Sequence, residues 1–441
     1  MNQNYKIFFW SLTAALGGFL FGFDTAVISG VEQTLQKLWQ LNSIQQGFVV
    51  SSALIGTVIG ALIGGIPAEK YGRKVTLYIV AITYLLSAIG TAYSVDWKYF
   101  MAFRFVGGLG VGVSSVVAPM YISEIAPPDK RGRLVAMFQF NIVFGILIAY
   151  FSNYLLGNIG ENAWRWMMGV QAVPSLVFLA SILVIPESPR WLILKKGNVA
   201  AARHILSIID ASTAEQVVQN IQQNTQTNQA SSFSSLFQNA YKRPIYLAVL
   251  FAFFNQVSGI NAIIYYAPRI FEMAGFGTDT ALLSSAGIGL INLLSTLIGI
   301  SLIDRFGRRM LMYIGSVGYI ISLSLIALAF YRNNFEGMSF FIFFFIASHA
   351  IGQGAVIWVF ISEIFPSEVR AHGQSLGSFT HWVLAAIIAF TFPYIAETFG
   401  GTVTFLFFAF MMVFQLLFVW RMMPETKGTA LEGNEKIVFG H

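Results

Sequence analysis

The chain has 441 residues, of which 56% are hydrophobic and only 10% are charged. These fractions exclude an ordinary soluble domain, and the absence of cysteine excludes thiolate catalysis, disulfides and cysteine-ligated metals. The net charge of +6 does not indicate nucleic-acid binding, because the basic residues fall in short loops between apolar runs. The sequence therefore predicts an all-α protein that spans a lipid bilayer many times.

Apolar windows of about twenty residues, the length that crosses a hydrocarbon core, recur along the chain. Twelve such windows begin near residues 7, 46, 75, 99, 134, 165, 244, 280, 310, 338, 374 and 402. With the N-terminus inside, the inner segments carry 20 Lys and Arg residues and the outer segments carry five. The positive-inside rule therefore predicts that both termini are cytoplasmic. The first apolar stretch is longer than a signal-peptide core, so we expect it to be retained as a helix.

One long polar segment, residues 191–243, separates the sixth and seventh spans and is rich in Gln, Asn and Ser. We expect it to form short cytoplasmic helices joined by a flexible stretch, although a regulatory or substrate-binding role is a second interpretation. The predicted organisation is a six-helix bundle over residues 1–190, this linker, a second six-helix bundle over 244–422, and a cytoplasmic tail over 423–441.

Three motifs occur twice in the chain. "GIPAEKYGRK" at 65–74 matches "ISLIDRFGRR" at 300–309, "SEIAPPDKR" at 123–131 matches "SEIFPSEVR" at 362–370, and "PESP" at 186 matches "PETK" at 424. The offsets of 235, 239 and 238 residues are nearly constant, which indicates two homologous halves of six spans each. Secondary transporters with such repeats bind their substrate near the middle of the bilayer, between the halves.

The duplicated motifs place carboxylates close to arginines at the inner ends of helices. Charge-assisted pairing between neighbouring helices could close the cytoplasmic side and release it when the halves move, and we call this set the cytoplasmic latch. Solvated helix ends that obey the positive-inside rule are the alternative interpretation. The predicted latch residues are Glu69, Arg73, Glu124, Arg131, Glu187, Arg190, Asp304, Arg308, Glu363 and Arg370.

Asp24 and Arg104 are charged residues within apolar spans, where a charge at the bilayer centre costs roughly 2.5–3.5 kcal/mol. Each lies about five residues from the outer end of its span, so both are roughly 7 Å below the outer surface. Glycines at four-residue spacing in these two spans, Gly18 with Gly22 and Gly108 with Gly112, are expected to let the helices approach.

We predict that Asp24 and Arg104 pair and that their separation drives proton uptake, because a lone desolvated carboxylate favours its neutral form. A permanent ion pair that only joins two helices is the alternative.

Uncharged hydrogen-bonding groups and aromatic side chains lie within the spans. Amides both donate and accept, as hydroxyl groups do, and an indole face suits the C–H face of a pyranose. A charged substrate would need a fixed counter-charge in the membrane, so the sequence favours an uncharged polyol or sugar. Interhelical hydrogen bonds and packing are the alternative roles for single residues. The candidate substrate-binding residues are Gln139, Asn255, Gln256, Asn261, Asn292, Trp358, His381 and Trp382, with Gly259 available to relax the helix.

Taken together, the paired Gly-Arg loops, "PESPRWL", "NQVSGINAIIYYAP", "SEIFPSEVR" and "PETKG" resemble the sugar porter family of the major facilitator superfamily. The resemblance covers nearly the whole chain apart from its tails. It implies the major facilitator fold and import of a monosaccharide by alternating access. It also implies proton symport, since uniporting relatives tend to carry asparagine in place of Asp24. The family's sugar site matches Gln139, Gln256, Asn261, Asn292, Trp358 and Trp382, and its outer gate matches Tyr265 and Tyr266.

Four positions depart from the family pattern. Gln171 stands where some proton-coupled members have a glutamate, so a second carboxylate in the relay is missing. Asn255 stands where a second glutamine is common, and His381 where an amide is usual. His381 could be an accessory proton site, with a neutral hydrogen-bonding histidine as the alternative. Ile146 replaces a glutamine of some pentose transporters, which favours a hexose and leaves a pentose as the alternative.

Other functions are also open. A facilitative uniporter would use the same fold with a static ion pair and no proton. A sugar sensor would require a long signalling tail, whereas eighteen residues follow the last span. The duplicated latch argues against a channel, and the lack of a nucleotide loop or catalytic constellation argues against an enzyme. We expect no cofactor or metal, and a monomer working in a bacterial inner membrane with a monosaccharide, a proton and lipid as its partners.

Overall fold

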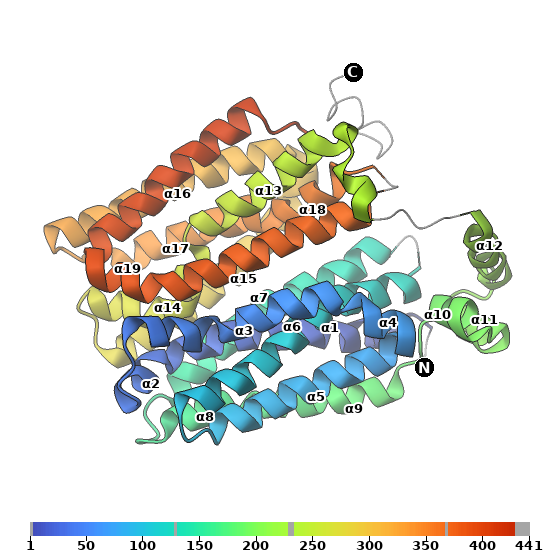
Figure 1. The fold of residues 1–441 in the computed structure, drawn as a ribbon, viewed down its shortest axis with the longest axis horizontal. Helices are drawn as coiled ribbons and strands as arrows, with labels where there is room; N and C mark the ends of the chain where they lie inside the picture. The colour runs from blue at the N-terminus through green and yellow to red at the C-terminus, as the bar shows by residue number, and fades with distance from the viewer. Residues whose placement is uncertain (1–2, 128–129, 228–232, 367–368, 428–441) are drawn as a thin grey trace. The chain divides into compact units, whose positions relative to one another are not determined.

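The computed structural model describes residues 3–127, 130–227, 233–366 and 369–427, and within these ranges every regular element is a helix (Figure 1). The predicted tail over 423–441 lies mostly outside the described residues. The helices before residue 228 are α1 (Gln3–Val27), η1 (Ile28–Gly30), α2 (Glu32–Leu38), α3 (Ser43–Ile63), α4 (Gly65–Tyr71), α5 (Arg73–Ala92), α6 (Trp97–Ile125), α7 (Arg131–Leu156), α8 (Ala163–Gly169), α9 (Ala172–Val184), α10 (Pro189–Lys196), α11 (Val199–Ile209) and α12 (Ala214–Thr227). Those after it are η2 (Phe233–Phe237), η3 (Asn239–Tyr241), α13 (Lys242–Val257), α14 (Ile260–Met273), α15 (Thr278–Phe306), α16 (Arg308–Arg332), α17 (Met338–His349), η4 (Ala350–Gly354), α18 (Ala355–Glu363) and α19 (Arg370–Arg421).

The chain divides into two compact units. Unit 1 comprises Met1–Thr25, Ser52–Ala149 and Asn162–Ala230, and unit 2 comprises Ala26–Ser51, Tyr150–Glu161 and Ser231–His441. Two segments with numbers below 190 therefore pack with unit 2, whereas the repeat predicts that they belong to the first bundle. The division of the chain at residues 190 and 244 stays a prediction.

Eleven helical segments of the described chain are long and apolar enough to cross a membrane. The last of them, α19, has 52 residues, about twice the length that a crossing needs. Gly400 interrupts this segment with φ 70° and ψ 173°, between the predicted spans that begin at 374 and 402. The structure therefore separates α19 into two lengths of helix, each long enough to span a bilayer.

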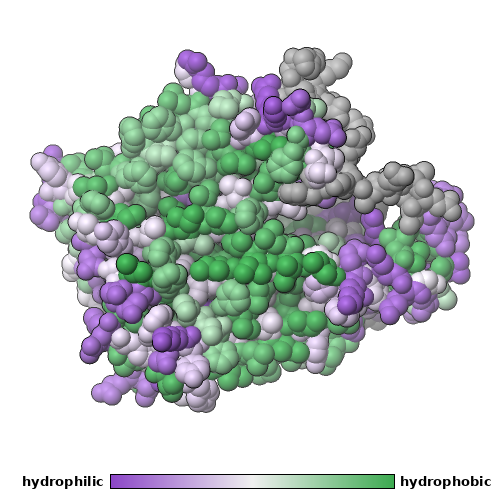
Figure 2. Space-filling view, viewed as in Figure 1, coloured by the Kyte–Doolittle hydropathy of each residue, from purple (hydrophilic) through white to green (hydrophobic). Residues whose placement is uncertain are grey.

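The surface of these helices suits hydrocarbon. On the face shown in Figure 2, hydrophobic residues cover the middle of the helices and hydrophilic residues gather towards their ends. Large apolar side chains such as Leu183, Val184 and Phe410 are more than half exposed. Because water would disfavour so many exposed apolar groups, lipid is the solvent that fits this surface.

Local sequence explains where several helices begin. The side chain of Asp96 accepts hydrogen bonds from the backbone N–H groups of Lys98 and Tyr99, which caps the first turn of α6. Ser188 caps α10 in the same way by accepting from the backbone N–H of Trp191, with Pro189 at the first helical position. These polar caps place the helix ends at the borders of the apolar segments.

The helix over residues 242–273 is broken into α13 and α14 at Gly259. This glycine has φ 83°, a left-handed conformation that a side chain disfavours, and a Cβ there would lie 2.6 Å from the Phe408 ring. The sequence predicts that Gly259 relaxes the helix, and the structure breaks the helix at this residue. Tyr266 adds a second irregularity inside α14, with φ −126° and ψ 23°. Two breaks close together leave α14 dependent on side-chain contacts for its position.

Candidate functional site

Asp24 on α1 and Arg104 on α6 form a buried ion pair in unit 1. Arg104 Nη1 lies 2.6 Å from Asp24 Oδ1, and Arg104 Nη2 donates to the Asp24 carbonyl oxygen at 3.2 Å. The two side chains are only 0% and 2% exposed. Arg104 Nε, also buried, has no hydrogen-bond partner among the described residues. The pair predicted from depth is therefore present, while its role in proton coupling stays a prediction.

Gln171 completes the surroundings of Asp24. It precedes α9, and its Nε2 donates to Asp24 Oδ1 at 3.4 Å. The position where some relatives have a carboxylate is thus occupied by a hydrogen-bond donor to Asp24. The sequence singles out Gln171 as a missing acid and does not identify it as a partner of the ion pair.

The glycines predicted to bring α1 and α6 together contact other helices, so this prediction is wrong about the partner. Added Cβ atoms on the two α1 glycines would meet the backbone of α7, and those on the two α6 glycines would meet the backbone of α3. The α1 residue packed against α6 is Gly17, which faces the Ser114 hydroxyl. Four-residue spacing identifies a close-packed helix face but carries no information about its neighbour.

A network around Arg73 joins α4, α5 and α6 in unit 1. Its guanidinium makes two bonds of 3.0 Å to Glu124 through Nε and Nη2, and Nη2 also donates to Glu69 at 3.1 Å. The two bonds to one carboxylate have the bidentate geometry that makes arginine pairs strong and directional. The three residues are all members of the predicted latch, and the spacing within the motifs does not identify which of them pair.

Glu187 belongs to the same network but binds backbone instead of arginine side chains. Its carboxylate accepts from the N–H groups of Arg73, Lys74 and Ser188, at 2.9, 3.1 and 2.8 Å for the closer oxygen. These contacts place a negative charge at the N-terminus of α5, where the helix dipole favours it. Burial nevertheless raises the pKa of Glu187 above its ordinary value, against the lowering effect of the three backbone bonds.

Unit 2 contains an equivalent network around Arg308. Its Nη2 and Nε donate to Glu363 at 2.8 and 3.1 Å, and Nη1 lies 3.2 Å from Asp304. Glu425 accepts from the backbone N–H groups of Arg308 and Arg309, both at 3.0 Å, as Glu187 does at α5. Glu425 is absent from the predicted latch, although the match of "PETK" to "PESP" is the signal that could have identified it.

Three predicted latch arginines have other surroundings. Arg131 begins α7 and Arg190 lies in the first turn of α10, and both are exposed. Arg370 donates from Nε to the carbonyl oxygen of Phe365. The Glu124 carboxylate is paired with Arg73 on a neighbouring helix, which is the kind of contact between helices that the latch requires. The role of these residues as a latch stays a prediction.

Amide side chains form a connected cluster in unit 2. Gln256 Oε1 accepts from Asn261 Nδ2 at 2.6 Å, and Gln256 Nε2 donates to Asn255 Oδ1 at 2.9 Å. Gln256 Nε2 also lies 3.1 Å from His381 Nδ1. The cluster thus joins the end of α13, the beginning of α14 and the first part of α19. Its donors and acceptors are those that hydroxyl groups need.

Two indole rings flank this cluster. The ring centroid of His381 lies 5.0 Å from that of Trp358 on α18 and 4.7 Å from that of Trp382. The structure therefore brings together six of the eight predicted substrate-binding residues, namely Asn255, Gln256, Asn261, Trp358, His381 and Trp382.

The remaining two predicted binding residues lie elsewhere. Asn292 on α15 is 7% exposed, and its Oδ1 accepts from Thr296 at 3.5 Å. Gln139 is partly exposed on α7 and belongs to unit 1, whereas the cluster belongs to unit 2. The hydrogen bond described for Asn292 stays within α15.

The predicted gate tyrosines are buried at the irregular part of α14. Tyr266 donates its hydroxyl to the carbonyl oxygen of Ala389 at 2.8 Å and packs against Phe392, with ring centroids 5.0 Å apart. Tyr150 donates to the carbonyl oxygen of Ile264 at 2.7 Å. Several polar contacts thus fix α14 from its sides.

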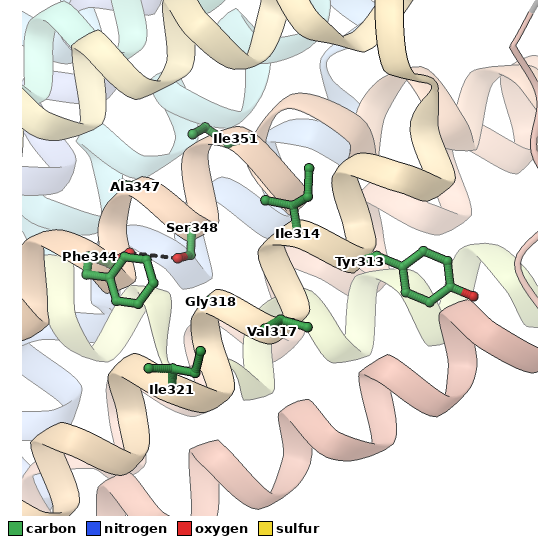
Figure 3. A pocket seen from close by; sticks show the side chains of 9 residues that line it. All are labelled: Tyr313, Ile314, Val317, Gly318, Ile321, Phe344, Ala347, Ser348 and Ile351. Atoms are coloured by element: carbon green, nitrogen blue, oxygen red, sulfur yellow. Dashed lines mark hydrogen bonds between the residues drawn. The ribbon is translucent and has the colours of Figure 1, made fainter.

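One surface cavity of about 460 Å³ lies between α16 and the segment formed by α17 and η4 (Figure 3). Its lining is almost entirely apolar, with Ile314, Val317 and Ile321 among the side chains around it. The Ser348 hydroxyl is already used, since it donates to the Phe344 carbonyl oxygen at 2.7 Å. This cavity suits an apolar group and lacks the polar atoms that a sugar requires.

Comparisons with known proteins agree with this architecture. The family model described as sugar (and other) transporter matches residues 10–437. The arabinose-proton symporter of Bacillus subtilis (strain 168) is 37% identical over 436 residues, covering 97% of this chain and 94% of the relative. The glucose transporter GlcP of Staphylococcus epidermidis (strain ATCC 12228 / FDA PCI 1200) is 35% identical over 435 residues, covering 98% and 96%.

Among solved structures, the xylose transporter XylE from E. coli in its inward open conformation has a TM-score of 0.86 to this chain. The sequence identity is 33%, and the match covers 98% of this chain and 100% of that chain. The chain therefore belongs to the sugar (and other) transporter family, within the sugar porters of the major facilitator superfamily.

Proposed function

We propose that this protein imports a monosaccharide together with a proton. The buried Asp24–Arg104 pair carries the proposal, because its carboxylate has the position and the partner that a coupling site requires. The names of its relatives, an arabinose-proton symporter and transporters of glucose and xylose, support sugar as the substrate and the proton as the coupling ion. The matched family consists of transporters, so an enzymatic activity is not proposed.

Asp24 is the proposed proton acceptor. In the proposed cycle the carboxylate is charged while Arg104 lies at 2.6 Å, and a movement that separates the two groups would leave it desolvated without its counter-charge. It would then take up a proton, and reunion with the guanidinium would release that proton. Gln171 supports the charged form by donating a hydrogen bond. We therefore propose that Asp24 is protonated in the state in which it is separated from Arg104.

The amide cluster with Trp358 and Trp382 is the proposed sugar site, to which Gln139 and Asn292 would contribute in some state of the cycle. Amides at hydrogen-bonding distance from one another can exchange those bonds for bonds to sugar hydroxyls. Ile146, which is buried on α7, stands where some pentose-transporting members of the family have a glutamine, and this difference favours a hexose over a pentose as the substrate. Relatives named for arabinose, xylose and glucose support the wider class of monosaccharides.

The proposed architecture has twelve crossings, since Gly400 divides α19 into two, and two six-helix bundles over 1–190 and 244–422 joined by the 191–243 linker. Both termini are proposed to face the cytoplasm, and the protein to work as a monomer in a bacterial inner membrane. Arg73 and Arg308 are the centres of the proposed cytoplasmic latch. Their equivalent networks support a cycle in which both halves move alike.

The test uses purified protein in liposomes that contain a pH-sensitive dye. External sugar is added without an imposed gradient, and wild type is compared with Asp24→Asn and with Asp279→Asn, which removes an exposed carboxylate from the first turn of α15. We expect sugar-dependent internal acidification in wild type and in Asp279→Asn. Asp24→Asn should lose acidification while sugar exchange continues. Sugar equilibration without acidification, unchanged in Asp24→Asn, would instead establish a uniporter with a static ion pair.

A further inference from the structure

A further buried ion pair lies outside every motif that the sequence shows. Arg269 on α14 donates from Nε and Nη2 to the two oxygens of Glu32 on α2, at 2.8 and 2.6 Å. The Glu32 side chain is fully buried and that of Arg269 is 18% exposed. Gln46 on α3 donates to the Glu32 carboxylate and to its carbonyl oxygen, and Gln36 accepts from Arg269. All four residues belong to unit 2.

Stability alone does not account for this pair. Removing two charges from water is so unfavourable that apolar residues of similar size usually stabilise a protein as well or better. The best-attested advantage of a buried ion pair is that it selects one arrangement of the elements that carry it. Here those elements are α14 on one side and α2 and α3 on the other.

The position of α14 is weakly determined by its own backbone. Gly259 breaks the helix before it, and the non-helical Tyr266 interrupts it again, so the segment can pivot about two points. Asn261, at its beginning, donates to Gln256 in the amide cluster, whereas Arg269 lies two turns later. Because Tyr266 lies between them, the Arg269 contact fixes the part of α14 that follows Tyr266, and the Asn261 bond fixes the part before it.

We propose that Glu32 and Arg269 are positioning residues that hold α14 against η1, α2 and α3 in one conformational state, and that this ion pair opens and re-forms in each transport cycle. The opening of the pair in each transport cycle rests on the proposed function. The contact by which the pair holds α14 does not depend on it. In the proposed orientation the pair lies at the outer ends of the helices, so it closes the outer end of unit 2.

The test exploits the absence of cysteine in the chain. Ser29 is 2% exposed in η1, which packs against α14, so Ser29→Cys introduces a single thiol that is covered while α14 is closed. The rate of labelling by N-ethylmaleimide is measured in the reconstituted full-length protein, without sugar. The Ser29→Cys background is combined with Glu32→Gln, with Arg269→Gln, and with the charge exchange Glu32→Arg/Arg269→Glu. Lys37→Gln, an exposed charge on the same short helix, is the matched control.

We expect Glu32→Gln and Arg269→Gln to be labelled about ten times faster than Ser29→Cys alone. A tenfold change corresponds to the weaker of the couplings measured between close charge pairs. The charge exchange should return the rate towards that of Ser29→Cys alone, and Lys37→Gln should leave it unchanged. The proposal is overturned if the single variants label at the background rate, or if the charge exchange labels as fast as they do. The second result would mean that packing, and not pairing, closes α14.

Two further measurements keep the outcome interpretable. Size-exclusion chromatography shows whether each variant is folded, and if Arg269→Gln is not, Glu32→Gln and the charge exchange still decide the question. Net sugar uptake and sugar exchange are then compared, and we expect Glu32→Gln to lower the maximal rate of net uptake more than it alters KM. Since labelling needs neither sugar nor protons, a failure of the proposed transport function would leave the labelling result intact.

Discussion

Arg104 Nη1 and Asp24 Oδ1 lie 2.6 Å apart, and neither side chain reaches solvent. Removing only Arg104 would leave a buried carboxylate without its counter-charge, which typically destabilises a protein by about 3–5 kcal/mol. We therefore expect Arg104→Gln to lower the thermal unfolding temperature in detergent more than the double variant Arg104→Gln/Asp24→Asn does. Equal destabilisation in the single and the double variant would show that the guanidinium stabilises the fold through contacts other than Asp24.

Gln256 is the centre of the amide cluster, with bonds or close contacts to Asn255, Asn261 and His381. Gln256→Ala should raise KM for the transported sugar about tenfold, since a lost hydrogen bond contributes about 0.5–1.5 kcal/mol and its partners lose their alignment. Uptake of labelled sugar by proteoliposomes measures this change. Ser375→Ala, which removes an exposed hydroxyl from α19, serves as the control and should leave KM unchanged. An unaltered KM in Gln256→Ala would place the sugar elsewhere.

Arg73 and Arg308 each bind one carboxylate through two nitrogen atoms. Lysine retains the charge but cannot form this fork, so Arg73→Lys and Arg308→Lys should both reduce the rate of net uptake. Because the two networks are equivalent, the reductions should be of similar size. Arg203→Lys in the exposed pair with Glu215 is the matched control and should have no effect. A large effect at one site and none at the other would contradict an equivalent role.

The pKa of Glu187 is raised above its ordinary value of 4.5, chiefly by burial. The folded protein then binds the proton more tightly than the unfolded chain, so this group lowers stability as pH rises from the ordinary value through the raised pKa. The unfolding temperature of wild type minus that of Glu187→Gln should therefore fall as pH rises from the ordinary pKa through the raised pKa. Differential scanning fluorimetry of the detergent-solubilised protein measures this difference.

Glu69 provides a control of opposite sign. Burial acts to raise the pKa of Glu69, but the charges and hydrogen bonds of Arg73 and Lys195 outweigh it and place the pKa below the ordinary value. Its contribution to stability is present above the ordinary value and is lost as pH falls through the lowered pKa. The difference between wild type and Glu69→Gln should therefore rise with pH. The same direction for both glutamates would contradict these assignments.

Gly259 has φ 83° and no room for a Cβ beside Phe408. Gly259→Ala should destabilise the protein by at least about 1–2 kcal/mol, the amount that a left-handed conformation costs an ordinary residue. Gly277→Ala is the matched control, because Gly277 has φ −67° and no atom within 4 Å of an added Cβ. Thermal unfolding of both variants tests the comparison, and equal unfolding temperatures would show that the break does not require a glycine.

Much of the fold can be predicted from the sequence because each membrane span depends only on the residues within it. Apolar windows locate the membrane helices, and the depth of Asp24 and Arg104 follows from counting residues along two helices. The break at Gly259 is also local, since only one backbone conformation is involved. A repeat at nearly constant offset further indicates that the Arg73 and Arg308 networks resemble each other.

The predictions that fail concern contacts between distant segments. Residue spacing places Glu124 among the latch residues without identifying its partner, which the structure shows to be Arg73 on a neighbouring helix. The four glycines of α1 and α6 face α7 and α3. The Glu32–Arg269 pair joins residues 237 positions apart and has no local pattern at all. Such contacts depend on helix packing, which residue spacing does not determine.

The amide of Gln171 beside Asp24 also bears on stoichiometry. An amide cannot take up a proton at physiological pH, so of Asp24 and Gln171 only Asp24 can exchange one. Symport through Asp24 would therefore move one proton with each sugar. One charge moving through 100 mV supplies about 2.3 kcal/mol, enough to concentrate a neutral sugar about fiftyfold. Each unit of pH difference would add about another factor of ten. In the proposed symport, the amide of Gln171 would therefore limit the steepest sugar gradient that one proton per sugar can sustain.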